Sequence, residues 1–276
     1  MFNYLKSSFA RKKARRITQE YPPRVESFNL GKYGVIDYAH WTNPLAPKIS
    51  IVEETVSFFN QFIKEGDLAI DIGANVGDTT VPMALCTGKT GMTIGFDPNP
   101  LVFKILQTNA SLNKDKYILD AENCAISTIE EEFYFISSEA SFANGAISPS
   151  KDSEHGKFVQ PNKVKGVNLK AFLESKYAHW ASKLSFIKID TEGYDKEIIK
   201  SISDLILKYK PVIVAESFGK ASDEAKIELY EVIAKNGYEI YYFEDFNVNA
   251  EVVKLNTAKD MLNYKHTINV YAKPNT

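Results

Sequence analysis

The chain has 276 residues, a net charge of −2, a hydrophobic fraction of 44% and two cysteines, Cys86 and Cys124. This length allows one large domain or two small ones with an ample core, and the near-neutral charge gives no global field that would favour nucleic acid. No apolar run approaches the roughly 20 residues that a membrane span needs. Because there is no secretory signal and no metal-type cysteine spacing, we expect a reduced, cytoplasmic protein.

The first sixteen residues, "MFNYLKSSFARKKARR", hold six Lys or Arg and no acid. Phe2, Leu5 and Phe9 fall at helical spacing, so the segment is either a basic amphipathic helix on an anionic membrane or partner, or a solvated leader helix or arm. Prolines then break any long element between residues 17 and 49. We therefore expect residues 1–49 to be a basic, irregular extension before a domain at 50–276.

From Ser50 onward the pattern predicts an alternation of helices and strands. Ser50 and Glu53 form a capping box for a helix that Gly66 ends. The predicted strands are 68–72, 92–96, 117–127, 185–190, 211–217, 238–244 and 267–272, with an added strand at 131–137. The predicted helices are 76–87, 100–112, 168–175, 195–207 and 222–236, the last capped by Ser222.

This alternation predicts an α/β fold with a seven-stranded, mostly parallel sheet and helices on both faces. The last strand is expected to be an antiparallel edge strand. Ligands bind such sheets beyond the carboxyl ends of the strands, so acids at those ends are candidates for a site. Residues 138–163 lack periodicity and predict a long loop, which could form a lid.

Two of these strand ends suggest a site for an adenosine-containing ligand. "AIDIGANVGD" (69–78) places Asp71 at the end of a strand and Gly73 and Gly77 in a tight turn. Twenty residues past Gly77, "GFDPNP" ends the next strand with Asp97, which can accept both hydroxyls of a ribose.

The same turn favours S-adenosyl-L-methionine over a dinucleotide. Asn75 and Asp78 stand where a G-x-G-x-x-G fingerprint needs glycine, and their side chains would crowd a pyrophosphate. Asp71 and Asp78 would also repel its charge, whereas a sulfonium cation would be attracted. A glycine turn with only a structural role is the alternative.

Taken together, "IDIGANVGDTT", "GFDPNP" with "LQTNASLN", and "FIKIDTEGYDKEII" resemble the FkbM-type family of class I S-adenosylmethionine-dependent methyltransferases, which have a Rossmann-like fold. The resemblance covers roughly residues 50–272. It departs from the family's K-I-D-x-E-G-x-E signature at Asp195, where a glutamate is usual.

The resemblance implies roles for the residues at the strand ends. Gly73 and Gly77 would line the methionine moiety, with Asp71 near its amino group, and Asn75 and Asp78 would cap the helix or touch the same end of the cofactor. Asp97 would hold the ribose. The adenine slot would be shaped by Pro98, Asn99 and the end of the third strand, including Asn123.

For catalysis the candidates are Asp190 and Glu192, as the base or as groups that orient the acceptor, with Glu216 third. Lys188 should pair with a carboxylate of residue 190, 192 or 216. A cluster of acids at a helix start is the alternative reading. His155 is a further candidate base, and a metal on Asp190 and Glu216 is a weaker option, so no metal is predicted.

The resemblance implies O-methylation of a sugar, glycan or secondary metabolite, and a role in polysaccharide biosynthesis. No nucleic-acid partner is expected. Two rival functions remain: a binding module that has lost catalysis, and an NAD-dependent oxidoreductase.

Overall fold

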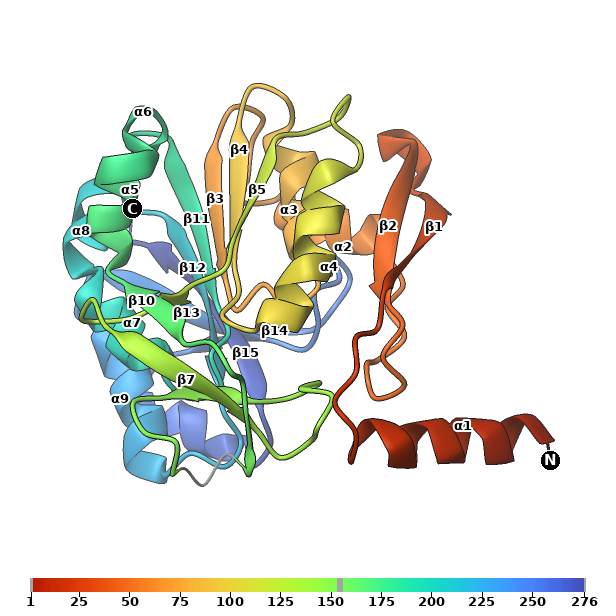
Figure 1. Cartoon of the computed structure of the whole chain (residues 1–276). Helices are drawn as coiled ribbons and strands as arrows, with labels where there is room; N and C mark the ends of the chain where they lie inside the picture. The colour runs from red at the N-terminus through yellow and green to blue at the C-terminus, as the bar shows by residue number, and fades with distance from the viewer. Residues whose placement is uncertain (1, 153–155, 276) are drawn as a thin grey trace.

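The computed structural model describes residues 2–152 and 156–275 (Figure 1). Its centre is an eight-stranded sheet in the order β14-β13-β15-β12-β11-β3-β4-β5. The strands are β3 (Leu68–Ile72), β4 (Met92–Phe96), β5 (Leu119–Glu122), β11 (Leu184–Ile189), β12 (Val212–Ser217), β13 (Tyr238–Phe243), β14 (Val252–Leu255) and β15 (Ile268–Pro274). The predicted α/β class is confirmed.

Two details of the sheet differ from the prediction. β15 is antiparallel but lies inside the sheet, between β12 and β13, so the expectation of a terminal edge strand was wrong. The edge is formed instead by β14, an eighth strand that pairs antiparallel with β13. Its short run of exposed residues gave no periodic signal.

Helices cover both faces of the sheet. One face carries α2 (Glu53–Phe59) and α3 (Thr80–Thr87), and the other carries α5 (Leu169–Lys176), α7 (Asp195–Ser201), α8 (Ser203–Tyr209) and α9 (Asp223–Ala234). Every residue of β3 is buried, as expected for a central strand. Side chains alternate between the faces, which directs Asp71 and Lys188 to the α3 side.

The helix boundaries are confirmed in part. α4 (Pro100–Ser111) and α9 begin as predicted, with the Asn99 and Ser222 side chains as caps. α2 begins at Glu53 after Val52, without a side-chain cap, and ends at Phe59, so the predicted Ser50 cap and Gly66 end were wrong.

The segment 17–49 is not irregular. β1 (Pro23–Asn29) and β2 (Val35–Trp41) form an antiparallel hairpin joined by the short helix η1 (Gly31–Tyr33). The hairpin is held to α4 by Asn109, whose Oδ1 accepts from Ala39 N at 2.7 Å and whose Nδ2 donates to Ala39 O at 3.0 Å. The prolines lie at its ends and allow it to form. α1 (Phe2–Ala14) precedes it.

The predicted long loop at 138–163 also contains strands. β7 (Glu132–Ser137) pairs with β8 (Ala146–Ser148), β9 (Phe158–Val159) and β10 (Val164–Val167), and β10 pairs with β6 (Ala125–Ile126). This second sheet lies beside the end of the main sheet where α4 begins (Figure 1). The remaining helices are α6 (Ala178–Ala181) and η2 (Ala258–Asn263). Among the described residues, no helix is long and apolar enough to cross a membrane.

Candidate functional site

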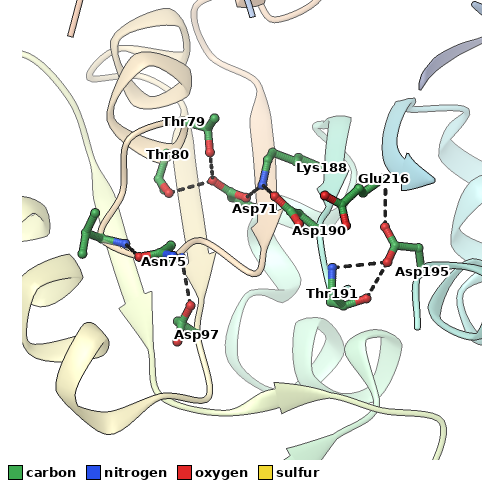
Figure 2. Close-up of polar contacts among 11 residues, drawn as sticks. Asp71, Asn75, Thr79, Thr80, Asp97, Lys188, Asp190, Thr191, Asp195 and Glu216 are labelled. Carbon is green, nitrogen blue, oxygen red and sulfur yellow. Dashed lines mark hydrogen bonds and ion pairs between the residues drawn. The ribbon is translucent and has the colours of Figure 1, made fainter. Parts of the chain in front are cut away.

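A buried ion pair lies at the centre of the candidate site. Lys188 and Asp71 are register partners on the parallel strands β11 and β3, and Lys188 Nζ donates to Asp71 Oδ1 at 3.2 Å (Figure 2). The other oxygen of Asp71 accepts from the hydroxyls of Thr79 and Thr80 at 2.8 and 2.7 Å. Asp71 is fully buried, so its carboxylate binds three donors of the protein itself.

Lys188 links this pair to the strand-end acids. Its Nζ also donates to Asp190 Oδ2 at 3.3 Å, which confirms the predicted pairing with residue 190. Burial acts to lower the pKa of Lys188, but the negative charges of Asp71 and Asp190 outweigh it and hold the pKa above its ordinary value. Lys188 is therefore an ammonium that offsets the charge of two carboxylates.

Asp78 is an acid whose charge is poorly compensated. Burial raises the pKa of Asp78, and the charge of Asp71 adds to this rise, while Lys188 opposes it. A bound cation next to Asp78 would favour its charged form.

The turn after β3 approaches two neighbouring segments closely. Gly73 has φ of 78°, and a Cβ there would lie 1.9 Å from the carbonyl oxygen of Asp190. A Cβ on Gly77 would lie 3.1 Å from Leu106 of α4. Between them Asn75 is left-handed, with φ of 48°. Both glycines therefore have a packing reason to be glycine, and any role in lining a ligand stays a prediction.

Asp97 ends β4 and joins the turn to the start of α4. Its Oδ2 accepts from Asn75 N and its Oδ1 from Asn99 N, both at 2.8 Å. Burial raises the pKa of Asp97 to about 7, although these two hydrogen bonds act to lower it. Each carboxylate oxygen has a second lone-pair site, so both can accept one further donor.

The other predicted adenine-side residues are held by main-chain contacts. Asn99 caps α4 by accepting from Leu101 N, and its Nδ2 donates to Phe142 O at 2.8 Å. Asn123 Nδ2 donates to the main-chain oxygen of Asp97 at 2.9 Å. Pro98, which stands between Asp97 and Asn99 in the chain, is half-buried. The structure thus brings Asp97, Asn99 and Asn123 together.

The acids Asp190, directly after β11, and Glu216, near the end of β12, lie side by side (Figure 2). Burial raises the pKa of Glu216 to about 8, and the charge of Asp190 is the next largest cause. Its Oε2 is buried and has no hydrogen-bond partner among the described residues. Glu192 is exposed, with φ of 52°, and its charge contributes less to the pKa of Glu216.

Asp195 is the residue that the sequence reasoning missed. Its Oδ2 accepts from Thr191 Oγ1 at 2.7 Å and from Thr191 N at 3.2 Å, and its Oδ1 accepts from Glu216 N at 2.9 Å (Figure 2). Asp195 is only 1% exposed, so it is not part of a solvated helix start. Asp195 links the ends of β11 and β12. Its position in the family's K-I-D-x-E-G-x-E signature was the feature of the sequence that could have indicated this role.

A cavity of about 20 Å³ lies beside this junction, lined by Gly193, Asp195, Glu216 and Lys226 among others. This volume holds roughly one water-sized group. Among residues 2–152 and 156–275, no three His, Cys, Asp or Glu side chains are grouped so that they could hold a metal ion. The candidate base His155 lies outside the described residues.

Comparisons with solved structures give remote similarities. An FkbM methyltransferase from Methylobacillus flagellatus is 11% identical, with a TM-score of 0.45 over 79% of this chain, and this chain spans only 50% of it. A precorrin-6y C5,15-methyltransferase from Geobacter metallireducens is 12% identical, with a TM-score of 0.40 over 80% of this chain and 85% of that one. An S-adenosylmethionine-dependent O-methyltransferase from Thermotoga maritima is 10% identical, with a TM-score of 0.43 over 92% and 78%.

A search of curated protein sequences finds no match. The family comparison is more informative, because a model described as the methyltransferase FkbM domain matches residues 71–240. That range is more than half of the chain and runs from Asp71 through all the strand-end acids to β13. The chain belongs to the FkbM methyltransferase domain family.

Proposed function

We propose that this protein is an S-adenosyl-L-methionine-dependent O-methyltransferase that acts on a hydroxyl of a sugar, glycan or secondary metabolite. The observation that carries the proposal is the arrangement of the glycine turn, Asp97 and Glu216 at the carboxyl ends of three parallel strands of one sheet, β3, β4 and β12, inside the range that matches the family.

The residues present fit this cofactor. The free lone pairs of Asp97 suit the two ribose hydroxyls, as the sequence suggested. Lys188 compensates the charge of Asp78 only in part, since burial and Asp71 leave its pKa raised, and a sulfonium or α-ammonium group beside it would favour the charged form. Asp71 is less suited to that role, because three donors of the chain already bind it. When bound, the cofactor would supply an activated methyl group.

The protein must then align the acceptor hydroxyl and accept its proton. Among the candidates, Glu216 is best suited to be the base, because a pKa of about 8 is near the operating pH and its Oε2 is unpartnered. Asp190 is tied to Lys188, and Glu192 is exposed. This assignment moves the expected base from Asp190 or Glu192 to Glu216.

Two adjacent carboxyl groups also favour a sugar as the acceptor. Glu216 would accept from the reacting hydroxyl while Asp190 accepts from its neighbour on the same ring, which suits a vicinal diol. Polysaccharide biosynthesis is the process to which such an acceptor belongs.

The domain division at residue 49 and a cytoplasmic location remain part of the proposal. The location is supported by Cys86 and Cys124, which are both buried and free.

Calorimetric titration with S-adenosylhomocysteine, NAD and NADP tests the cofactor. We expect binding of S-adenosylhomocysteine alone. Binding of NAD without S-adenosylhomocysteine would overturn the proposal in favour of an oxidoreductase. Transfer of a labelled methyl group to polysaccharide and nucleotide-sugar fractions then tests the acceptor, and binding without transfer to any fraction favours a non-catalytic module.

A further inference from the structure

The N-terminus of this chain is charged very differently from the rest. Residues 1–16 hold six basic and no acidic side chains, and the last turn of α1 carries Arg11, Lys12 and Lys13. The whole chain has 33 Lys and Arg against 35 Asp and Glu, so residues 17–276 hold 27 basic and 35 acidic side chains, a net charge of −8. The molecule is therefore a strong electrical dipole with its positive end at α1.

α1 is not packed along the body of the protein. An open groove of about 770 Å³ lies between them, lined by Phe9, Lys12 and Lys13 of α1 and by Gln19, Tyr21 and Pro44 among others. Directly after the helix the chain is attached to the body by a hydrogen bond from Ala140 N to Arg15 O at 3.2 Å and by an ion pair between Arg15 and Glu139. Figure 1 shows α1 extending outward from this attachment.

Apolar side chains are exposed among these basic residues. Phe9 is 72% exposed and Ile17 is 50% exposed. Exposed apolar groups gain free energy when they enter an apolar medium, at roughly 25 cal/mol per Å². Attraction of basic residues to anionic lipids and burial of exposed apolar area are the two contributions that bind a segment to the interface of an anionic membrane.

The attachment also sets which end of the molecule would face such a surface. Ala140 binds Arg15, directly after α1, and two residues later Phe142 O accepts from Asn99, the cap of α4. Asn99 follows Asp97 at the carboxyl end of β4. α1 therefore leaves the body at the end of the sheet that carries the candidate site (Figure 1).

We propose that α1 and the basic residues after it dock on an anionic phospholipid bilayer, with Phe9 and Ile17 at the level of the headgroups. Arg11, Lys12 and Lys13 then lie against lipid phosphates, and the strand ends face the membrane. A bilayer fits better than a nucleic acid because a duplex offers no apolar layer for Phe9 and Ile17. Docking does not depend on methyl transfer and would stand if the proposed function failed.

Sedimentation of the full chain with vesicles tests this docking. We expect binding to vesicles of phosphatidylcholine mixed with phosphatidylglycerol, little binding to phosphatidylcholine alone, and weaker binding as salt rises. Each basic residue near an anionic surface contributes about fivefold in affinity, so the triple variant R11Q/K12Q/K13Q should bind roughly 100-fold more weakly. Phe9→Ser should cost about tenfold or more.

The matched control is K89Q/K235Q/K259Q, which removes the same charge from three exposed lysines elsewhere. It should keep its vesicle affinity, and melting curves should show that all variants are folded. The proposal is overturned by equal binding to both kinds of vesicle, or by equal losses in the two triple variants. Binding to a DNA duplex without binding to anionic vesicles would also overturn it, and an unchanged Phe9→Ser variant would contradict the insertion of Phe9.

Discussion

Lys188 Nζ lies 3.2 Å from Asp71 Oδ1, across strands β11 and β3, in a part of the fold where both side chains are at most 4% exposed. Removing one partner of a buried pair leaves an uncompensated charge, which costs about 3–5 kcal/mol. We therefore expect Lys188→Met to lower the free energy of unfolding by that amount, measured by denaturant titration. Lys170→Met is the control: its pair with Asp204 is exposed and should contribute little to stability. A Lys188→Met variant as stable as wild type would show that the pair is not charged in the fold.

Asp97 is the residue whose removal should weaken cofactor binding most directly. Hydrogen bonds to charged groups are worth about 1.5–3 kcal/mol, so Asp97→Ala should bind S-adenosylhomocysteine roughly 10–150-fold more weakly in calorimetry. Because Asp97 also accepts from the main chain of Asn75 and Asn99, the melting temperature should fall too. Asp115→Ala removes an exposed acid and should change neither quantity. Unchanged affinity in a folded Asp97→Ala variant would place the ribose elsewhere.

The strand-end acids could be predicted from sequence because their placement follows from local order. Asp97 and Glu216 each end an apolar run that precedes a helix, and parallel strands bring such ends to one edge. What could not be predicted was which acids bind one another. The pairing of Asp71 with Lys188 depends on strand register between residues 117 positions apart, and nothing local specifies it.

The hairpin at 23–41 escaped prediction for a similar reason. Its position depends on Asn109, which lies 70 residues beyond Ala39 in the chain and binds its main chain on both sides. The added strands after β7 likewise form only by pairing back onto it. Asp195 begins α7 as predicted, but its burial and its hydrogen bond to Glu216 N on β12 depend on a residue 21 positions away and could not be predicted from its sequence neighbours.

Glu216→Gln should lower turnover by about 10²–10⁴-fold if Glu216 is the base, because the amide cannot accept the proton. Affinity for S-adenosylhomocysteine should stay near wild type. In the wild-type enzyme the rate should rise with pH through about 8, as Glu216 loses its proton, and level off above it. Asp190→Asn and Glu192→Gln are the comparison variants, and Glu192→Gln should have the smallest effect. A Glu216→Gln variant with normal turnover would return the role of base to Asp190 or Glu192.

Glu216 should also make the stability of the protein depend on pH. Its pKa in the fold is raised from the ordinary 4.5 to about 8, so the folded state favours the neutral acid. The resulting stabilisation is fully present below about pH 4.5 and is lost as pH rises through 8. Glu216→Gln cannot lose it, so its melting temperature relative to wild type should increase from pH 5 to pH 9, by roughly 2–4 °C per kcal/mol. The raised pKa of Asp97 cancels in this difference, because Asp97 is not among the charges that act on Glu216. Glu244→Gln, at an exposed position, is the control. If the difference in melting temperature between wild type and Glu216→Gln stays constant from pH 5 to pH 9, Glu216 titrates in the fold as it does in water. The argument for Glu216 as the base would then lose its support.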